Sequence, residues 1–366
     1  MKKLLSFLII LMICFLGFAQ TKFIPAGNKA FRYVGRYGSS IPNEIRFDWT
    51  GFYIQFSFRG TSCALRMSDS GHNYYNVYLD DQAPKTIEVY SDTTLQIASG
   101  LETQVHRVQV FKRTEGSQGI ASFKGILIPE KGEMLEWKEI PKRKIEFIGN
   151  SITCGYGTEG LTKNERWKPS TENSSQSYAT IMARALQADY HLTAHSGQGV
   201  VRNYGYREKN SPLAMPGRFN RVFDEKDQPV WDFRKWKPDV VVINLGTNDF
   251  STQPFPDKAD FKNGYEKLIR EVLKQYGELP VFCLVGPMTD EPCYSYVKEL
   301  VEDLRSVYQK KNVFFVGIPT YLMDPEKDLG SDSHPNFSGQ KKMAAHVLPV
   351  ISSVTGWEFQ GNELKF

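Results

Sequence analysis

The sequence predicts two domains in tandem, an all-β sandwich followed by an α/β/α domain built on a parallel sheet. In the first half apolar and polar residues alternate with period two, whereas in the second half short apolar strands alternate with helical segments. The chain has 366 residues, more than one hydrophobic core comfortably organises. We place the sandwich at residues 20–138 and the α/β/α domain at residues 139–366.

The first residues, "MKKLLSFLIILMICFLGFAQ", have the composition of a secretory signal peptide. Two lysines precede an apolar run, and small residues follow it, so we expect residues 1–19 to be removed after Ala19. The run is shorter than the roughly 20 residues that span a bilayer, which disfavours an uncleaved anchor. No later segment is apolar enough to cross a membrane. The sequence therefore predicts a secreted or periplasmic protein.

The segment "FYIQFSFRG" is typical of the strands expected in the sandwich. Phe52, Ile54, Phe56 and Phe58 point to one side, and the residues between them point to the other, as in a strand with one buried face. Similar runs recur, separated by Gly, Asp, Ser and Pro, without an amphipathic helix between them. This favours an antiparallel sandwich. The runs are "SCALRM", "YNVYLD", "HRVQVFK" and "SFKGILI".

After the polar segment that begins at Pro129, strands and helices alternate. The residues "YVKELVEDLRSVYQ" have helical spacing, with apolar side chains from Val297 to Tyr308 on one face. Such alternation predicts a parallel sheet with helices on both faces, whose ligands bind beyond the carboxyl ends of the strands. The predicted strands are residues 145–148, 240–245, 281–285 and 313–316.

Four polar segments follow predicted strands or lie near the C-terminus. "GNSITCGYG" presents the Ser151 hydroxyl, "SGQGVVRNYG" offers backbone N–H groups at Gly197 or Gly199, "GTND" offers the Asn248 amide, and "SDSHPN" contains His334. A hydroxyl nucleophile, a base and neutral donors around one point are what acyl transfer needs. The alternative for Ser151 by itself is a helix cap.

Taken together, these blocks resemble those of the SGNH (GDSL-like) hydrolase superfamily, with Asn150 where those blocks usually have Asp. With a strand-rich N-terminal domain, the chain looks most like carbohydrate esterase family 2, acetylxylan-esterase-like enzymes with a jelly-roll domain before the SGNH domain. The resemblance implies that Ser151 is the nucleophile and an oxyanion donor, and that His334 is the base. It further implies that Gly197 and Asn248 complete the oxyanion hole, with Gly199 as a competitor for Gly197.

The activity that the resemblance implies is the removal of O-acetyl groups from plant polysaccharides such as xylan and glucomannan, without a metal or other cofactor. Tyr204, within "VVRNYG", is the preferred candidate for stacking on a sugar ring, ahead of Tyr156 and Trp167. Two other functions stay open: an acetyl transferase that uses the same residues, and a glycan-binding protein with a degenerate hydrolase domain. The oligomeric state also stays open.

The support of His334 has two alternatives. Ser331 lies three residues before it, where many SGNH enzymes have Asp. Asp332 lies two residues before it, and in an extended chain residues i and i+2 project to the same side. We prefer a Ser151, His334, Asp332 triad. A dyad whose histidine is held by a backbone carbonyl, as in some members of carbohydrate esterase family 2, is the alternative.

Charge and cysteine usage exclude other classes of function. Without residues 1–19 the formal charge falls from +4 to +2, which gives no electrostatic case for nucleic acid or anionic lipid. His191 and His195 are four residues apart on an expected strand, so we expect packing and hydrogen bonding there, not a metal site. Cys283 and Cys293 either pair or are buried as small apolar residues.

Overall fold

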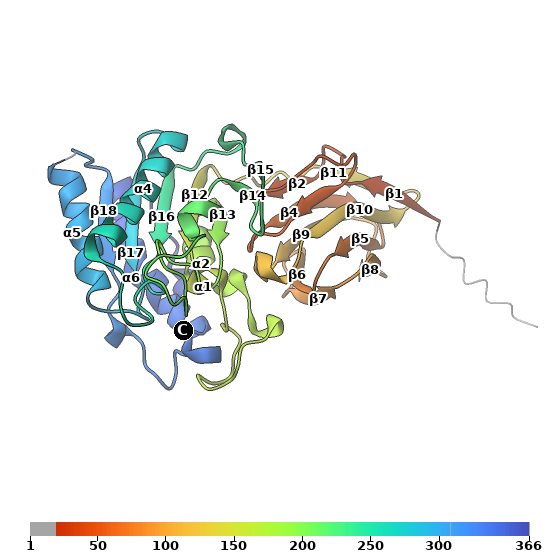
Figure 1. Cartoon of the computed structure of the whole chain (residues 1–366). Helices are drawn as coiled ribbons and strands as arrows, with labels where there is room; N and C mark the ends of the chain where they lie inside the picture. Colours follow the sequence, from red (N-terminus) through yellow and green to blue (C-terminus); the bar gives the residue numbers. More distant parts are fainter. Residues whose placement is uncertain (1–19, 308, 366) are drawn as a thin grey trace, which may run out of the picture.

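The computed structural model describes residues 20–307 and 309–365, arranged as two domains side by side (Figure 1). The predicted signal peptide, residues 1–19, lies outside the described residues. The N-terminal part up to Leu135, here called the β domain, contains antiparallel sheets, and the part from Arg143 onward, the α/β domain, contains a parallel sheet. Among the described residues, no helix has the length and apolarity needed to cross a membrane.

Two antiparallel sheets make up the β domain, in the orders β1-β10-β5-β8 and β11-β4-β9-β6-β7, with β3 paired to β10 and β2 to β4. Their facing side chains form one hydrophobic core, which confirms the predicted sandwich. The strands are β1 (Thr21–Pro25), β2 (Arg32–Val34), β3 (Ile45–Phe47), β4 (Tyr53–Arg59), β5 (Cys63–Asp69), β6 (Asn73–Leu79), β7 (Lys85–Val89), β8 (Thr93–Ala98), β9 (Val105–Lys112), β10 (Ala121–Pro129) and β11 (Glu133–Leu135).

Strand β4 is buried on both faces. Phe56 and Phe58 point into the sandwich core as predicted, but Tyr53 and Gln55 on the opposite face are buried too. The Tyr53 hydroxyl donates a hydrogen bond to the Asp189 carboxylate of the α/β domain at 2.8 Å. The expectation of a solvated second face is therefore wrong, because the α/β domain covers it.

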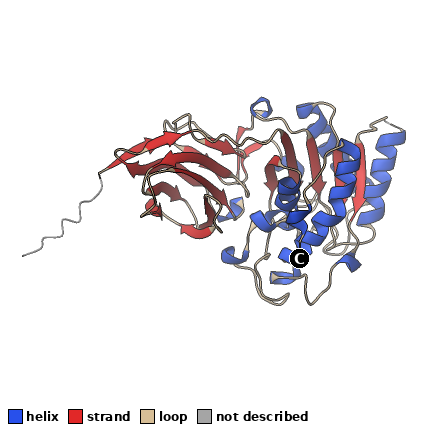
Figure 2. Cartoon of the chain, turned by 180° about the vertical axis from the view of Figure 1, so that it is seen from behind, coloured by secondary structure: helices blue, strands red, loops and turns tan. Residues whose placement is uncertain are grey.

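The α/β domain has a five-stranded parallel sheet in the order β13-β12-β16-β17-β18. Helices cover both faces (Figure 2). Alternate side chains of β16 show why: Val240 and Val242 pack with α2 and α6, whereas Val241 and Ile243 pack with α4 and α5. The elements are β12 (Arg143–Gly149), α1 (Ser151–Cys154), α2 (Tyr178–Ala185), β13 (Ala188–Ala194), α3 (Met215–Arg218), β14 (Arg221–Phe223), β15 (Lys226–Val230), β16 (Val240–Asn244), α4 (Lys258–Tyr276), β17 (Val281–Val285), α5 (Cys293–Ser306), β18 (Val313–Gly317) and α6 (Phe337–Thr355).

Helix α5 ends earlier than the sequence predicts, and short 3-10 helices complete the chain. Helix α5 buries Val297 and Leu300 as predicted, but it ends at Ser306, so Val307 is 67% exposed. Tyr308 lies outside the described residues. The 3-10 helices are η1 (Gly116–Gln118), η2 (Pro169–Thr171), η3 (Ser174–Gln176), η4 (Phe233–Lys235), η5 (Thr320–Leu322), η6 (Ser331–Ser333) and η7 (Gly361–Leu364).

Buried polar contacts join the two domains. The Arg36 guanidinium of the β domain pairs with the Glu146 carboxylate of β12 at 2.7 Å, and both side chains are at most 1% exposed. Trp49 donates its indole N–H to the carbonyl of Val222 at 3.0 Å. Because buried charges need partners, this contact fixes the β domain against the sheet that carries the active-site loops.

The cysteines and the surface give two further results. Cys63, Cys154, Cys283 and Cys293 are free and buried, so Cys283 and Cys293 pack as small apolar residues and do not pair.

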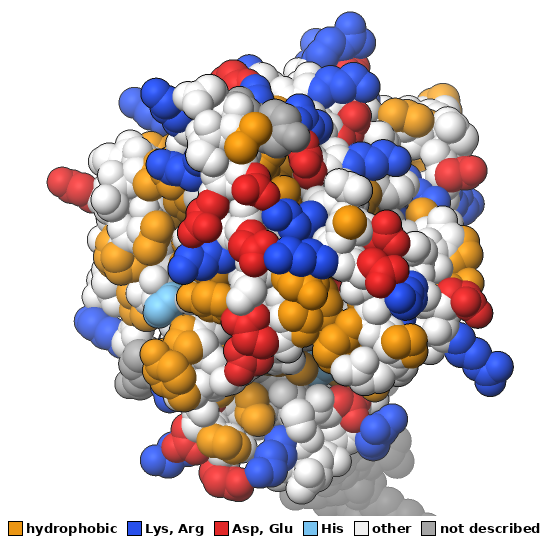
Figure 3. Space-filling view, turned by 60° about the vertical axis from the view of Figure 1, so that its left-hand side comes forward, with side chains coloured by type: hydrophobic (Ala, Val, Ile, Leu, Met, Phe, Trp, Pro, Cys, Tyr) orange, Lys and Arg blue, Asp and Glu red, His pale blue; other side chains and the backbone are white. Residues whose placement is uncertain are grey.

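On the face shown in Figure 3, acidic and basic side chains are interspersed without a large patch of one sign. That distribution agrees with the near-neutral charge of the sequence.

Candidate active site

Ser151 lies at the carboxyl end of β12, as the first residue of α1. Its backbone N–H is in the first turn, where no intrahelical acceptor exists. The Asn150 side chain caps the helix by accepting a hydrogen bond from the N–H of Ile152 at 3.2 Å. The Ser151 hydroxyl lines a cavity of about 640 Å³, together with Gly197, Asn248 and His334. The fold thus brings the four predicted segments to one cavity.

His334 lies in hydrogen-bond contact with Ser151. The His334 Nε2 atom is 2.9 Å from the Ser151 hydroxyl oxygen, and its Nδ1 atom is 3.1 Å from the backbone carbonyl oxygen of Asp332. A carbonyl only accepts hydrogen bonds, so Nδ1 carries the proton and Nε2 is left as the acceptor for the serine hydroxyl. This is the tautomer that a general base for Ser151 requires.

The Asp332 carboxylate bonds to groups other than the imidazole, and His334 Nδ1 contacts the Asp332 backbone instead, which corrects the preferred triad. It accepts hydrogen bonds from the Tyr156 hydroxyl at 2.9 Å and from the backbone N–H of Trp167 at 3.0 Å. It also pairs with Arg166 at 3.0 Å. The i and i+2 argument fails because the chain is not extended here: Asp332 and Ser333 have φ angles of +50° and +60°. The geometry is that of the alternative, a dyad with carbonyl support.

The left-handed turn at Asp332 and Ser333 is held by the loop before Trp167. The backbone N–H of Asp332 donates to the carbonyl of Glu165 at 2.8 Å, and that of Ser333 to the carbonyl of Lys163 at 3.0 Å. Non-glycine residues with positive φ are costly and persist where surrounding contacts hold them. We infer that the Asp332 side chain contributes by anchoring this turn, which aims the carbonyl at His334.

Gly197, not Gly199, has a backbone N–H available to a ligand. Gly199 donates its N–H to the Asn203 side chain at 3.2 Å, and a Cβ there would lie 1.9 Å from the carbonyl oxygen of Arg202. Gly197 lines the cavity, and within residues 20–307 and 309–365 its N–H has no hydrogen-bond partner. Its φ of +75° explains why glycine occupies the position. The structure therefore favours the predicted donor over its competitor.

The Asn248 amide also faces the cavity. It donates one hydrogen to the carbonyl of Gln198 at 2.8 Å, which orients the group and leaves its second hydrogen for a ligand. The next residue, Asp249, accepts hydrogen bonds from the backbone N–H groups of Val200, Val201 and Arg202 at 2.8–3.1 Å. Asp249 thus fixes the loop that follows Gly197.

Glu115, a residue of the β domain, reaches the same loop and was not predicted. Its buried carboxylate accepts a hydrogen bond from the backbone N–H of Ser196 at 2.6 Å, one residue before Gly197. The same oxygen lies 3.4 Å from the sulfur of Cys154 in α1. Glu115 therefore connects the β domain to the backbone donor and to the helix that carries Ser151. The sequence contains no local signal for a contact across 81 residues.

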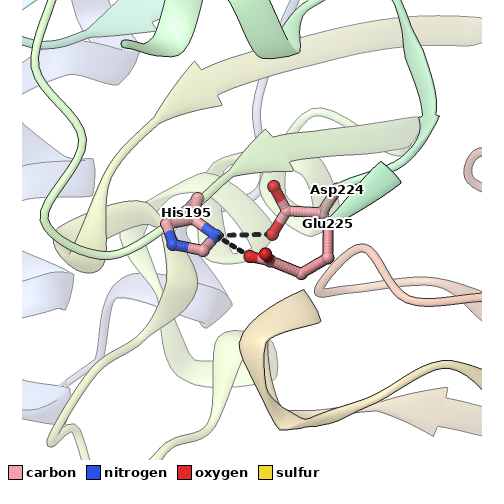
Figure 4. Close-up of side chains that lie close together, drawn as sticks. All are labelled: His195, Asp224 and Glu225. Atoms are coloured by element: carbon pink, nitrogen blue, oxygen red, sulfur yellow. Dashed lines mark hydrogen bonds and ion pairs between the residues drawn. The ribbon is translucent and has the colours of Figure 1, made fainter. Parts of the chain in front are cut away.

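His195, Asp224 and Glu225 lie close together beside this loop (Figure 4). His195 Nδ1 is 2.6 Å from the Asp224 carboxylate, and Arg218 is 2.8 Å from its other oxygen. Burial lowers the pKa of His195, but the Asp224 carboxylate more than offsets this and raises it to about 9. The two carboxylates already have cationic partners, so a metal ion would have to displace Arg218. His191 instead stacks on Trp236, with centroids 3.7 Å apart.

The aromatic candidates divide into two groups. Tyr156 packs between Trp167, at 5.2 Å between ring centroids, and His334, at 4.2 Å. Tyr156 therefore packs directly against the ring of His334, and Trp167 supports Tyr156 from its other side. Tyr204 lines the cavity and is 70% exposed, so its ring is available to a substrate.

The surroundings keep His334 neutral. Burial lowers the pKa of His334 to about 4, because the imidazolium loses hydration, and the Asp332 carbonyl and carboxylate offset this only in part. The pKa of Asp332 itself lies below its usual value: partial burial raises it, but the hydrogen bonds from Trp167 and Tyr156 outweigh that effect. At neutral pH the site therefore holds an unprotonated imidazole against the serine hydroxyl.

Comparison with known proteins identifies the family of the chain. Residues 33–137 match the profile described as Carbohydrate esterase 2 N-terminal, and residues 147–342 match the GDSL-like Lipase/Acylhydrolase family. Over 295 residues the chain is 30% identical to an Acetylxylan esterase / glucomannan deacetylase of Cellvibrio japonicus, covering 76% of this chain and 79% of that protein. The chain belongs to carbohydrate esterase family 2.

Two further matches place this family 2 esterase among its relatives. It is 38% identical over 335 residues to Cellulase/esterase CelE of Acetivibrio thermocellus, covering 90% of this chain but only 40% of CelE. A family two carbohydrate esterase from Clostridium thermocellum, solved in complex with cellohexaose, has a TM-score of 0.84 at 37% identity, covering 89% of this chain and 99% of that one. The protein is accordingly a carboxylic ester hydrolase.

The first prediction concerns the pH dependence of the esterase. Only neutral His334 can accept the serine proton. The value of kcat/KM should therefore be maximal above the pKa of the imidazole and should fall as the pH is lowered through that pKa. With that pKa lowered to about 4, the acidic limb for p-nitrophenyl acetate should lie well below the usual histidine value of about 6.5. Burial raises the pKa of Asp249 to about 6. If the acidic limb of kcat/KM instead lies near pH 6 and shifts in Asp249→Asn, the ionisation of Asp249 controls the pH dependence.

The second prediction separates the two supports for His334. Replacing the carboxylate of a true triad by an amide costs about 10⁴ in kcat. Here the carbonyl is part of the backbone, so Asp332→Asn, which tolerates positive φ, should lose less than about tenfold in kcat/KM. Asp332→Ala, which also loses the anchors to Tyr156 and Trp167, should lose more than Asp332→Asn. A loss near 10⁴ in Asp332→Asn would restore the triad.

The third prediction concerns Glu115. Glu115→Ala leaves the Ser196 N–H without its buried acceptor, so the loop that carries Gly197 should loosen and kcat should fall about tenfold, less than the loss expected for deleting an oxyanion donor. Glu115→Gln keeps a side-chain oxygen for that N–H and should stay closer to wild type. Glu133→Ala, at an exposed position of the same domain, is the matched control. Equal activity of Glu115→Ala and Glu133→Ala would contradict the assignment.

Proposed function

We propose that the protein is an exported serine esterase that removes O-acetyl groups from plant polysaccharides such as xylan and glucomannan. The observation that carries the proposal is the contact between Ser151 and the Nε2 atom of His334, with its tautomer set by the Asp332 carbonyl. The choice of substrate is supported by two relatives from Cellvibrio japonicus, each named Acetylxylan esterase / glucomannan deacetylase. Export is supported by the composition of residues 1–19.

In the proposed reaction, the Ser151 hydroxyl oxygen attacks the carbonyl carbon of the acetyl group while His334 Nε2 takes the hydroxyl proton. The N–H groups of Ser151 and Gly197 and the Asn248 amide stabilise the oxyanion that forms. The bond to the sugar oxygen then breaks, and His334 returns the proton to that oxygen. Acetyl-serine and a free sugar hydroxyl result.

In the second half, His334 removes a proton from water, whose oxygen attacks the acetyl carbonyl. The same donors stabilise the second oxyanion, and Ser151 recovers its proton as acetate leaves. The exposed ring of Tyr204 at the edge of the cavity supports stacking of the sugar that carries the acetyl group. No step requires a metal or another cofactor.

The decisive experiment is acetate release by Ser151→Ala from acetylated xylan and acetylated glucomannan. The variant loses the attacking oxygen, so we expect a fall of several orders of magnitude, by analogy with other serine nucleophiles. Ser99→Ala, at an exposed position of the β domain that lines neither cavity, is the matched control and should keep near-native rates. Release by Ser151→Ala at a near-native rate would refute the mechanism.

A further inference from the structure

A second cavity lies between the domains and has no place in the reaction described above. Its volume is about 760 Å³, and it is lined by β4, β6 and β9 of the β domain and by β13 and η3 of the α/β domain. In Figure 1 this is the region where β6 and β9 approach the α/β domain. None of its lining residues also lines the active-site cavity. We call it the interdomain cleft.

Tyr190 supplies the observation that points to a ligand. It lines the cleft and is only 7% exposed, yet its hydroxyl has no hydrogen-bond partner within the part of the chain that the structure describes. Buried tyrosine hydroxyls usually bond to protein groups, whereas the Tyr190 oxygen is not sealed from solvent and is therefore open to the cleft. The other buried tyrosines of the described residues follow that rule: Tyr53 bonds Asp189, Tyr75 bonds Asp69, Tyr178 bonds Thr153, Tyr265 bonds the carbonyl of Ile243 and Tyr276 bonds Glu146.

Tyr78 extends the same surface. It is half-buried, lines the cleft, and in residues 20–307 and 309–365 its hydroxyl is also without a hydrogen-bond partner. The ring of Tyr190 packs on that of Tyr53, with centroids 5.3 Å apart. The cleft thus presents aromatic ring surface next to two hydroxyls that can each donate and accept a hydrogen bond.

The charged groups that line the cleft already have partners. Those of Asp80, Glu159 and Arg184 are His106, Arg113 and Glu363, which lie outside the lining. Arg107 pairs with Asp81 at 2.8 Å and with Glu139 at 2.6 Å, and Asp189 pairs with Arg32. A charged ligand would therefore find no free counter-charge among these groups. Apolar ring surface combined with uncommitted hydroxyls suits a neutral molecule that has C–H faces and many hydroxyls, which is the surface chemistry of a sugar ring. Cavities of this size at domain interfaces are common ligand sites.

We propose that the interdomain cleft is a second carbohydrate-binding site, which holds a deacetylated stretch of the polysaccharide whose acetyl groups are removed at Ser151. The identification of the ligand as this polysaccharide rests on the proposed function. The two cavities lie along the same segments: Lys163 and Arg166 line the active-site cavity while Glu159 and Gln176 line the cleft. A long chain that occupied both cavities would have a raised effective concentration of acetyl groups near Ser151.

The experiment measures retardation of the full chain carrying Ser151→Ala in native gels that contain soluble deacetylated glucomannan or xylan. Tyr190→Phe removes only the unpartnered hydroxyl and keeps the ring packing, so it should fold and bind about fivefold more weakly, the effect of one neutral hydrogen bond. Tyr78→Ala should weaken binding at least as much. Tyr321→Phe, at a position that is 87% exposed and lines neither cavity, is the matched control and should leave retardation unchanged.

Kinetics of the same substitutions with Ser151 intact complete the test. Both cleft variants should hydrolyse p-nitrophenyl acetate like wild type but show a raised KM for polymeric acetylated glucomannan. Unchanged retardation in both cleft variants, with loss in Tyr204→Ala, would place all binding in the active-site cavity and overturn the proposal. Absence of retardation in every form, with acetate release intact, would also overturn it. Retardation that is weakened in the cleft variants, without acetate release by wild type from any glycan, would refute the proposed function and keep the site.

Discussion

The buried ion pair between Arg36 and Glu146 constrains the arrangement of the whole molecule. The Glu146 carboxylate also accepts hydrogen bonds from the hydroxyls of Thr193 and Tyr276, at 2.7 and 2.5 Å, so three elements of the α/β domain converge on it. The guanidinium lies within 6 Å of the ring centroids of Trp49, Phe219, Trp231 and Phe233. Substituting either residue alone would leave the other charge buried without its partner, which costs about 3–5 kcal/mol. The β domain is therefore a fixed part of the enzyme.

That fixed position gives the β domain a direct part in the active site. Glu115 can hold the Ser196 N–H only if the sandwich stays docked, and the face of β4 that carries Tyr53 forms one wall of the interdomain cleft. The same docking therefore maintains a small cavity around Ser151 and a second cavity beside it. In the proposed two-site arrangement both domains contribute to glycan binding, although every residue that lines the active-site cavity belongs to the α/β domain.

Site residues could be predicted from the sequence where a reactive side chain lies at a position that the local secondary structure defines. Ser151, Asn248 and His334 could be predicted because each follows a strand or lies in a recognisable polar block, and parallel strands bring such positions to one edge of the sheet. The choice between Gly197 and Gly199 depended on which N–H is already bonded, which spacing does not reveal. The support of His334 depended on two positive φ angles at Asp332 and Ser333, and the i and i+2 rule assumes an extended chain. Glu115 and Tyr190 required knowledge of how the domains dock.

The support of His334 by a carbonyl has a consequence for the evolution of the enzyme. In a triad the third member is a side chain, so one nucleotide change can delete it. Here the supporting oxygen belongs to the peptide backbone and is present whichever amino acid the codon for position 332 specifies. What selection must preserve is instead the path of the main chain, which is distributed over the contacts of Tyr156, Glu165 and Trp167. A substitution at position 332 therefore keeps the supporting oxygen but removes the carboxylate that anchors the turn to Tyr156 and Trp167, whereas an insertion or deletion in the loop would displace the oxygen itself.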